Sequence, residues 1–428
     1  MFKRAVLCVS LSVPLCAMAA DAAPASQDET LRTLDERVRL LEQQQKSRPV
    51  AASQAFNPDI SLILSGTYGN LQRDPAIPAT GFAMSPNNNG HTRGFSLKES
   101  ELGMSADIDP QFRGGGTFSL AADGGIAVEN AFVQTTAWGD GLSLKFGRFF
   151  SGLGYLNEQH AHAWDFVDQP LVYLAFWDNQ LADDGVQLKW LAPTGTFFEV
   201  GGELGNGRSF PGSGQQKNGA GSGVLFAHVG DDVGLSSSWR AGVSLHQTRQ
   251  ANWNSSVPNP AGVLVTDSFS GDVHTAGLDF VWKYAPGGNA TVTNLKLQGE
   301  YFRRNQKGLL TYNPNPPATP GTTDGYASTQ SGWYLQGVYQ FMPNWRAGLR
   351  YDRLDSGSAQ VGPLNAANVI GRYGYTPTRG TLMLDYSPSE FSRLRLQLAR
   401  DNSRQGLPDT QVFVQYVMSM GAHGAHQF

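Results

Sequence analysis

Apolar and polar side chains alternate along the chain from residue 56 onward, in segments separated by glycine, proline, asparagine and aspartate. The segment from Trp239 to Leu245 is the clearest, and 345–352 and 393–398 repeat its pattern. A period of two is typical of β-strands with one apolar and one polar face. The pattern therefore predicts an all-β protein. Its polar faces would look at bulk water in a β-sandwich and at a wet lumen in a transmembrane barrel.

The links between the segments distinguish these two architectures. Sixteen segments can be drawn, and tight links such as 109–111 and 342–344 alternate with long ones. The long links cover 71–93, 150–182, 206–220, 250–271, 306–327 and 355–374. Short turns at one end and long loops at the other are typical of outer-membrane barrels, with periplasmic turns and extracellular loops. The sequence therefore predicts an antiparallel transmembrane β-barrel of about sixteen strands over 56–428, a size that encloses an aqueous channel.

The first 55 residues have a different pattern. A basic start, an apolar run and the small-residue cleavage site at 17–19 predict a secretory signal peptide over 1–19. Residues 20–55 contain two heptads of apolar positions in LRTLDERVRLLEQQQ, which predict a short periplasmic coiled-coil helix followed by a linker. This helix either joins three copies of the chain or is a fraying tether, because a helix so short is marginal alone.

Composition removes several classes of function. The net charge of −4 and the pI near 6.1 provide no basic excess for nucleic acid. Both cysteines, Cys8 and Cys16, fall within the signal peptide, so the mature chain has no thiol for a disulfide, a zinc site or catalysis. The chain also lacks G-x-S-x-G, H-E-x-x-H and phosphate-loop motifs. We therefore expect no enzymatic activity.

The link at 150–182 has an unusual composition for a loop in water. It contains SGLGYLNEQHAHAWDFVDQPLVYLAFWDNQLA, which is rich in aromatic and apolar residues. An in-folded loop explains this composition better than a surface loop does, because large apolar patches are rarely left exposed. We predict that this third extracellular loop folds into the barrel and forms its constriction.

Five side chains of this loop carry groups that suit a metal ion: Glu158, His160, His162, Asp165 and Asp168. Imidazole and carboxylate suit zinc, and weak convergent ligands near the narrowest part of a pore give transient selectivity without trapping the ion. The spacing H-x-H-x-x-D is much less diagnostic than a C-x-x-C pair. The alternative interpretation is that the histidines form hydrogen bonds that hold the loop to the barrel wall.

The inward faces of the predicted strands carry charges of both signs. The predicted pore-lining basic residues are Lys189, Arg240, Lys296, Arg346, Arg350, Arg393 and Arg395, and the acidic ones are Glu199, Glu203, Glu300 and Asp352. A slight basic excess attracts anions, because a low-dielectric wall strengthens a row of charges. The alternative is a transverse field across a non-selective channel, with opposite charges on opposing walls.

Four segments carry a resemblance to known proteins: FNPDISLILSGTYG, NEQHAHAWDFVDQP, DDGVQLKWLAPT and MSMGAHGAHQF. With its signal peptide, coiled coil, strands and terminal Phe428, the chain resembles Gram-negative porins of the phosphate- and polyphosphate-selective group. These segments are most similar to an uncharacterised outer-membrane family sometimes labelled as zinc-regulated receptors. The resemblance implies an outer-membrane channel, outer-membrane lipid and lipopolysaccharide as surroundings, and a terminal aromatic residue that the barrel-assembly machinery reads.

Together these observations predict a homotrimeric porin of the bacterial outer membrane. It would pass small hydrophilic solutes or ions by passive or facilitated diffusion, with no resident cofactor and with 150–182 as its constriction. The alternative is a zinc-related uptake channel or receptor whose loop histidines bind the metal transiently. The sequence leaves the permeant solute and its charge open.

Overall fold

The computed structural model describes residues 58–74, 77–82, 91–98, 100–120, 124–213, 218–258, 263–313, 320–368 and 374–421. These residues fall within one compact unit, Phe56–Phe428. The predicted signal peptide, the coiled-coil helix with its linker, and Phe428 lie outside the described residues.

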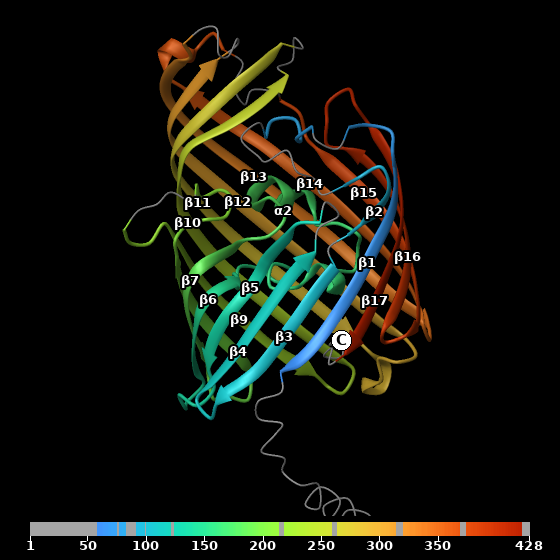
Figure 1. Cartoon of the computed structure of the whole chain (residues 1–428). Coiled ribbons are helices and arrows are strands. Elements are labelled where there is room, and N and C mark those ends of the chain that lie inside the picture. Colours follow the sequence, from blue (N-terminus) through green and yellow to red (C-terminus); the bar gives the residue numbers. More distant parts are fainter. Residues whose placement is uncertain are drawn as a thin grey trace, which may run out of the picture. The chain divides into compact units, whose positions relative to one another are not determined.

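The described strands form one closed antiparallel sheet, a β-barrel (Figure 1). The strands are β1 (Asp59–Leu71), β2 (Gly94–Leu97), β3 (Ser100–Asp109), β4 (Phe112–Leu120), β5 (Ile126–Thr135), β6 (Leu142–Phe150), β7 (Ala182–Leu191), β8 (Phe197–Gly205), β9 (Ser222–Val233), β10 (Ser237–Pro258), β11 (Leu264–Tyr284), β12 (Asn294–Asn313), β13 (Thr322–Met342), β14 (Trp345–Val361), β15 (Thr378–Ser389), β16 (Ser392–Asn402) and β17 (Asp409–Gly421). β1 pairs with β17, which closes the sheet. β2 and β3 both pair with the same side of β1 and therefore count as one strand position in the barrel. The barrel thus has sixteen strand positions, as predicted.

The alternation read from the sequence separates the outside of the barrel from its inside. In β10, Val243 and Leu245 are more than half exposed on the outer surface, whereas Ser244 and His246 between them are buried. Leucines of the other long strands are exposed in the same way, as the lipid-facing surface of a transmembrane barrel requires. Within the described residues, no helix has both the length and the apolar character needed to cross a membrane.

Two links that the sequence assigned to long loops are mostly strand, and the first third of another is strand. β10 and β11 leave only 259–263 between them, β12 and β13 leave only 314–321, and β14 continues to Val361. The inward faces of these extensions hold an apolar cluster that includes Phe269, Leu310 and Tyr326. This buried apolar face keeps the strand extensions paired. In the sequence, polar residues and glycine lie between the apolar residues of the cluster, so the period-two pattern is hard to recognise there. β10 to β14 therefore rise above their neighbours at one side of the rim (Figure 1).

The segment between β6 and β7 lies inside the barrel (Figure 1). This segment, residues 151–181, is called the lumen loop below. It contains the short helices η1 (Ala161–Ala163) and α2 (Leu171–Trp177). α2 begins after Pro170 and ends where Asp178 adopts a left-handed conformation. All seven residues of α2 are buried, in an apolar cluster that includes Phe302, Tyr334 and Leu354 of the wall.

Candidate functional site

The first half of the lumen loop contacts an acidic part of the barrel wall. His160 Nδ1 lies 3.1 Å from Glu129 Oε2 on β5 and 3.4 Å from Glu101 Oε2 on β3. His162 Nδ1 lies 2.9 Å from Glu101 Oε1, and Asn130 Nδ2 lies 3.0 Å from His160 Nε2. The two imidazole rings stack with their centroids 5.7 Å apart. Both histidines therefore meet wall carboxylates that sequence reasoning missed.

These carboxylates change the protonation of the loop. Burial lowers the pKa of His160, but Glu101 and Glu129 outweigh burial and raise it to about 10. The imidazolium form of His160 is therefore favoured at neutral pH. In that form the ring is positively charged between two wall carboxylates and attaches the loop to β3 and β5.

We expect this attachment to weaken at alkaline pH. Because the folded pKa of His160 is raised from 6.5 to about 10, its contribution to stability is complete below 6.5 and is lost as pH rises through 10. Protease accessibility of the lumen loop in detergent-solubilised protein, followed from about pH 6 to about pH 11, measures the loss. His160→Gln removes the titrating group and should flatten the profile; an equally steep profile in that variant would assign the change to another group.

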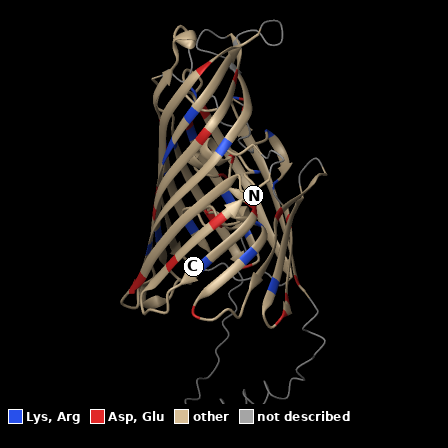
Figure 2. Ribbon diagram, turned by 90° about the vertical axis from the view of Figure 1, so that its left-hand side faces the viewer, with Lys and Arg blue, Asp and Glu red and all other residues tan. Residues whose placement is uncertain are grey.

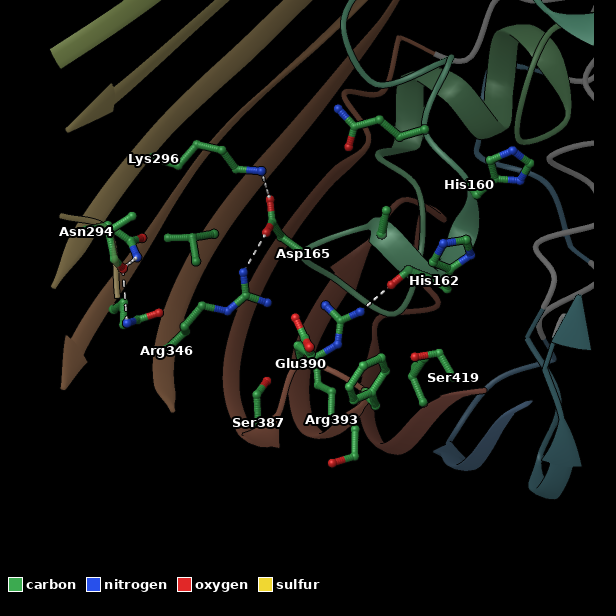
Figure 3. A pocket seen from close by; sticks show the side chains of 18 of the residues that line it. His160, His162, Asp165, Asn294, Lys296, Arg346, Ser387, Glu390, Arg393 and Ser419 are labelled. Carbon is green, nitrogen blue, oxygen red and sulfur yellow. Dashed lines mark hydrogen bonds and ion pairs between the residues drawn. The ribbon is translucent and has the colours of Figure 1, made fainter. Parts of the chain in front are cut away.

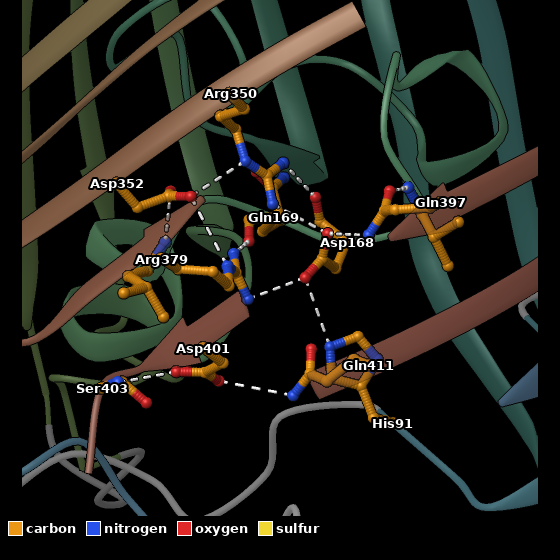
Figure 4. A network of polar contacts seen from close by, with 12 residues as sticks. His91, Asp168, Gln169, Arg350, Asp352, Arg379, Gln397, Asp401, Ser403 and Gln411 are labelled. Carbon is orange, nitrogen blue, oxygen red and sulfur yellow. Dashed lines mark hydrogen bonds and ion pairs between the residues drawn. The ribbon is translucent and has the colours of Figure 1, made fainter. Parts of the chain in front are cut away.

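Asp168 lies at the centre of a second, buried polar network, which joins the loop to other strands of the wall (Figure 4). Its Oδ1 accepts hydrogen bonds from Arg350 Nη2 at 2.8 Å and from Gln397 Nε2 at 3.0 Å. Its Oδ2 lies 2.7 Å from Arg379 Nη1 and 3.3 Å from His91 Nε2. Burial raises the pKa of Asp168, but Arg379 and Arg350 outweigh burial and hold it well below its ordinary value. Asp168 is therefore ionised and fixes the loop to β14, β15 and β16.

A second carboxylate completes this network. Asp352 Oδ2 lies 3.1 Å from Arg350 Nε and 3.5 Å from Arg379 Nε, and its Oδ1 accepts a hydrogen bond from the Leu171 backbone N–H at 3.0 Å. Buried charges are tolerated when they are paired and hydrogen-bonded. Arg350 and Asp352, predicted to line the pore, thus face inward but bind the lumen loop.

Asp165 joins the loop to another pair of wall cations (Figure 3). It forms an ion pair with Lys296 on β12, and its Oδ1 lies 3.4 Å from Arg346 Nη1 on β14. Arg346 also lies 2.6 Å from Asp385 Oδ2 on β15. Burial raises the pKa of Asp165, but Lys296 and Arg346 lower it to about 2.

Glu300 on β12 holds the loop without a cation. It accepts hydrogen bonds from the backbone N–H groups of Tyr155 and Leu156, both at 3.1 Å. The hydroxyl groups of Tyr173 and Tyr334 donate to it at 2.9 and 2.6 Å. Gly154 is required beside it, because a Cβ there would lie 2.2 Å from Glu300 Oε2. Glu300 is therefore an anchor of the lumen loop.

A cavity of about 670 Å³ lies at the short-turn end of the barrel, beside the lumen loop (Figure 3). Its walls include Asn344 and Glu390 of the short turns, Ser387 of β15, and Glu158 and Asp165 of the loop. In the predicted topology this end faces the periplasm. Glu158, the fifth candidate metal ligand, thus lines this cavity.

Three other predicted pore-lining residues, Lys189, Glu199 and Glu203, lie on the β7–β8 side of the wall. Lys189 Nζ lies 3.2 Å from Glu199 Oε2, and both side chains are partly exposed. Glu203 accepts hydrogen bonds from the Gly152 backbone N–H and from Gln187 Nε2, both at 2.8 Å. Glu203 therefore contacts the lumen loop, whereas Lys189 and Glu199 pair with each other.

The remaining predicted basic residues donate to carbonyl groups of the loop. Arg240 donates to Gly154 O at 2.9 Å, Arg395 donates to Trp164 O at 2.9 Å, and Arg393 donates to His162 O. Arg395 also pairs with Asp385 at 2.7 Å. Figure 2 shows that residues of both charges are distributed along the strands of the barrel.

The five loop residues predicted as one group have different partners. His160 and His162 contact the acidic β3–β5 wall, and Asp165 and Asp168 contact the basic β12–β16 wall. Four of the five, Glu158, His160, His162 and Asp165, line the cavity. The histidines do form hydrogen bonds or ion pairs to the wall, as the alternative interpretation expected. Sequence reasoning missed Glu101, Glu129, Arg379 and Gln397 as partners of the loop, and their only signal was their inward parity in strands.

The closed barrel of sixteen strand positions, its polar inner face and its in-folded loop give the chain the fold of an outer-membrane β-barrel of the size of a porin. Two solved structures of OmpT, an outer membrane protein of Vibrio cholerae, have a similar fold. A loop L8 deletion mutant matches with a TM-score of 0.50 and 14% identity over 85% of this chain and 99% of that chain. The trimer form matches with a TM-score of 0.50 and 12% identity over 84% and 99%. The fold indicates a location in the bacterial outer membrane.

No family model matches the sequence. A protein of Aquifex aeolicus (strain VF5), described as uncharacterized, is 30% identical over 407 residues, covering 88% of this chain and 81% of that protein. The chain belongs to the same family as this Aquifex protein.

Proposed function

We propose that the protein is a channel for the diffusion of small hydrophilic solutes or ions across the outer membrane, and that the lumen loop controls their passage. The observation that carries this proposal is the loop's double attachment. The loop leaves the wall at β6 and β7, contacts β3 and β5 through His160, and contacts β14 to β16 through Asp168. β14 lies opposite β6 in the order of strands around the barrel, so the loop spans the lumen. The proposal assigns the interior to passage and gives it no catalytic role.

The attachments favour control rather than simple filling. Most of them are ion pairs and charge-assisted hydrogen bonds, whose partners exchange readily for water or solute ions where they are exposed. Lys296 and Arg346 are partly exposed beside the cavity, whereas Arg350 and Arg379 are buried. The loop is therefore held most loosely where solutes can reach it.

Conductance of purified, full-length protein in a planar lipid bilayer tests the channel. Insertion should give discrete conductance steps, and steps grouped in threes would support the proposed homotrimer, for which the trimer form of OmpT is a structural parallel. Heat-unfolded protein is the control. A folded barrel that inserts and leaves the bilayer non-conducting at every voltage contradicts the proposal.

A second candidate function is uptake of zinc, and one cluster favours it. His160, Glu101 and Glu129 each offer a ligand atom, and these atoms lie within 4.8 Å of one another. One imidazole and two carboxylates form a donor set that suits zinc. The metal would replace the proton on His160, so affinity should rise with pH. The family resemblance to zinc-regulated receptors, and to phosphate-selective porins, stays a prediction.

Calorimetric titration with Zn²⁺ separates the two functions. The intact protein should bind the ion, whereas Glu101→Gln/Glu129→Gln should not, although it keeps both histidines. His162→Ala serves as the comparison, because His162 is not in the three-residue cluster. Absence of heat in the intact protein removes zinc from consideration and leaves the diffusion channel untouched.

A further inference from the structure

We propose that the channel takes small organic acids, and that Asp165 and Asp168 are tethered carboxylates occupying the wall sites through which those acids pass. The inference rests on the proposed channel function and names its substrate class. In the structure described above, the loop supplies its own carboxylates to these sites. Passage requires that solute carboxylates replace them.

The site around Asp168 has the features of a carboxylate receptor. One guanidinium approaches each oxygen, at 2.8 Å from Arg350 and at 2.7 Å from Arg379, and the Gln397 amide adds a third donor at 3.0 Å. Guanidinium groups match carboxylates in geometry as well as charge. These three residues come from adjacent strands, β14, β15 and β16, and His91 Nε2 adds a further contact to Oδ2 at 3.3 Å. The loop contributes the carboxylate and two backbone carbonyls, Asp168 O and Gln169 O, which accept from Arg350 and Arg379.

The site around Asp165 has a similar set of donors and borders the cavity, although Asp165 itself is buried. Lys296, Arg346 and the Gln336 amide converge on its carboxylate, with Gln336 Nε2 at 3.1 Å. Asp165, Lys296 and Arg346 all line the cavity of about 670 Å³ (Figure 3). A solute carboxylate in that cavity reaches the same donors. Exchange with Asp165 then replaces one set of ion pairs by an equivalent set.

The wall keeps a cationic excess even with the loop in place. The ion pairs of Asp165 and Asp168 connect five wall cations, Lys296, Arg346, Arg350, Arg379 and Arg395, to two wall carboxylates, Asp352 and Asp385. The wall residues of this network thus carry three more positive than negative charges, and the two loop aspartates reduce this excess to one. A row of cations on a low-dielectric wall attracts anions and repels cations. Displacement of the loop therefore exposes an anion path along β12 to β16.

Removing the loop carboxylates tests the inference. Asp165→Asn/Asp168→Asn should raise conductance severalfold and shift the reversal potential in a KCl gradient toward that of chloride. Asp272→Asn is the matched control, because Asp272 forms an exposed ion pair with Arg249 outside the lumen. A folded double variant with unchanged selectivity overturns the inference. If the double variant does not fold, conductance and reversal potential are measured on Asp165→Asn alone, at the site that borders the cavity.

Competition on the intact protein identifies the class of anion. Succinate and acetate, added on the short-turn side, should change the chloride current at lower concentrations than phosphate does. The concentrations are compared per unit of anionic charge. If phosphate is more potent, the ligand is phosphate and the carboxylate proposal is wrong. If none of the three anions changes the current, the inference is overturned. A conducting channel with either negative result still supports the proposed function, whereas a barrel that never conducts removes both.

Discussion

A variant in which residues 153–179 are replaced by a short glycine–serine turn is expected to conduct severalfold more current than the intact protein. The ends of the deletion lie close together, because Ser151 N–H donates to Leu181 O at 2.9 Å and Phe150 pairs with Ala182. β6 and β7 can therefore be joined as a hairpin without moving the wall. A barrel of sixteen strands without its loop leaves an open aqueous channel.

Single-channel recording of the two proteins in the same salt measures this effect. The deletion exposes inward charges such as Glu300 and Arg350 to water, which solvates them, so the barrel should still form; heat-modifiable migration on a gel checks this. Shortening the 206–221 link, which also joins two strands, is the control for loop deletion as such. Equal conductance of deletion and intact protein would mean that solutes do not pass the lumen loop.

Replacement of Glu300 by leucine is expected to release the lumen loop and to destabilise the protein by roughly 3 kcal/mol or more, because each buried donor left without an acceptor costs about 1–3 kcal/mol. Four donors lose their acceptor: the Tyr155 and Leu156 N–H groups and the Tyr173 and Tyr334 hydroxyls. Both tyrosines are almost fully buried, so water does not replace the carboxylate easily.

Thermal unfolding in detergent and proteolysis of the loop measure the two parts of this effect. Glu300→Gln keeps one acceptor oxygen and should lie between leucine and the natural residue. Glu390→Leu, on an exposed turn, controls for loss of a charge. An unchanged melting temperature and an equally protected loop in Glu300→Leu would show that the apolar packing of α2 holds the loop by itself.

The barrel could be predicted from the sequence because its signal is local. Alternation from Trp239 to Leu245 needs only neighbouring residues, and the burial of Ser244 and His246 confirms the predicted faces. The inward course of the loop could also be predicted, because large apolar side chains such as those of α2 are rarely left exposed to water. The upper halves of β10 to β14 could not, since their buried cluster forms only between strands.

The partners of the loop could not be predicted, because they depend on the lumen. His162 and Asp165 are three residues apart, and this spacing suggests one site. The chain between them crosses from the acidic wall to the basic wall, so His162 meets Glu101 while Asp165 meets Lys296. Glu101 precedes His162 by 61 residues, and Lys296 follows Asp165 by more than a hundred. Sequence spacing contains no information about such distances across a barrel.

The uneven rim has a consequence for how the mouth is approached. β10 has 22 residues and β11 has 21, whereas β4 and β8 have nine each. Each extra residue adds about 3.3 Å along a strand, so the rim is higher on the β10–β14 side than on the β4–β8 side. In the proposed channel, solutes would enter over the lower side of the rim. We therefore expect a large binder on the β10–β14 side, such as an antibody against an epitope inserted between β12 and β13, to leave that entrance clear. The tall strands would then serve as a binding surface that is separate from the path of the solute.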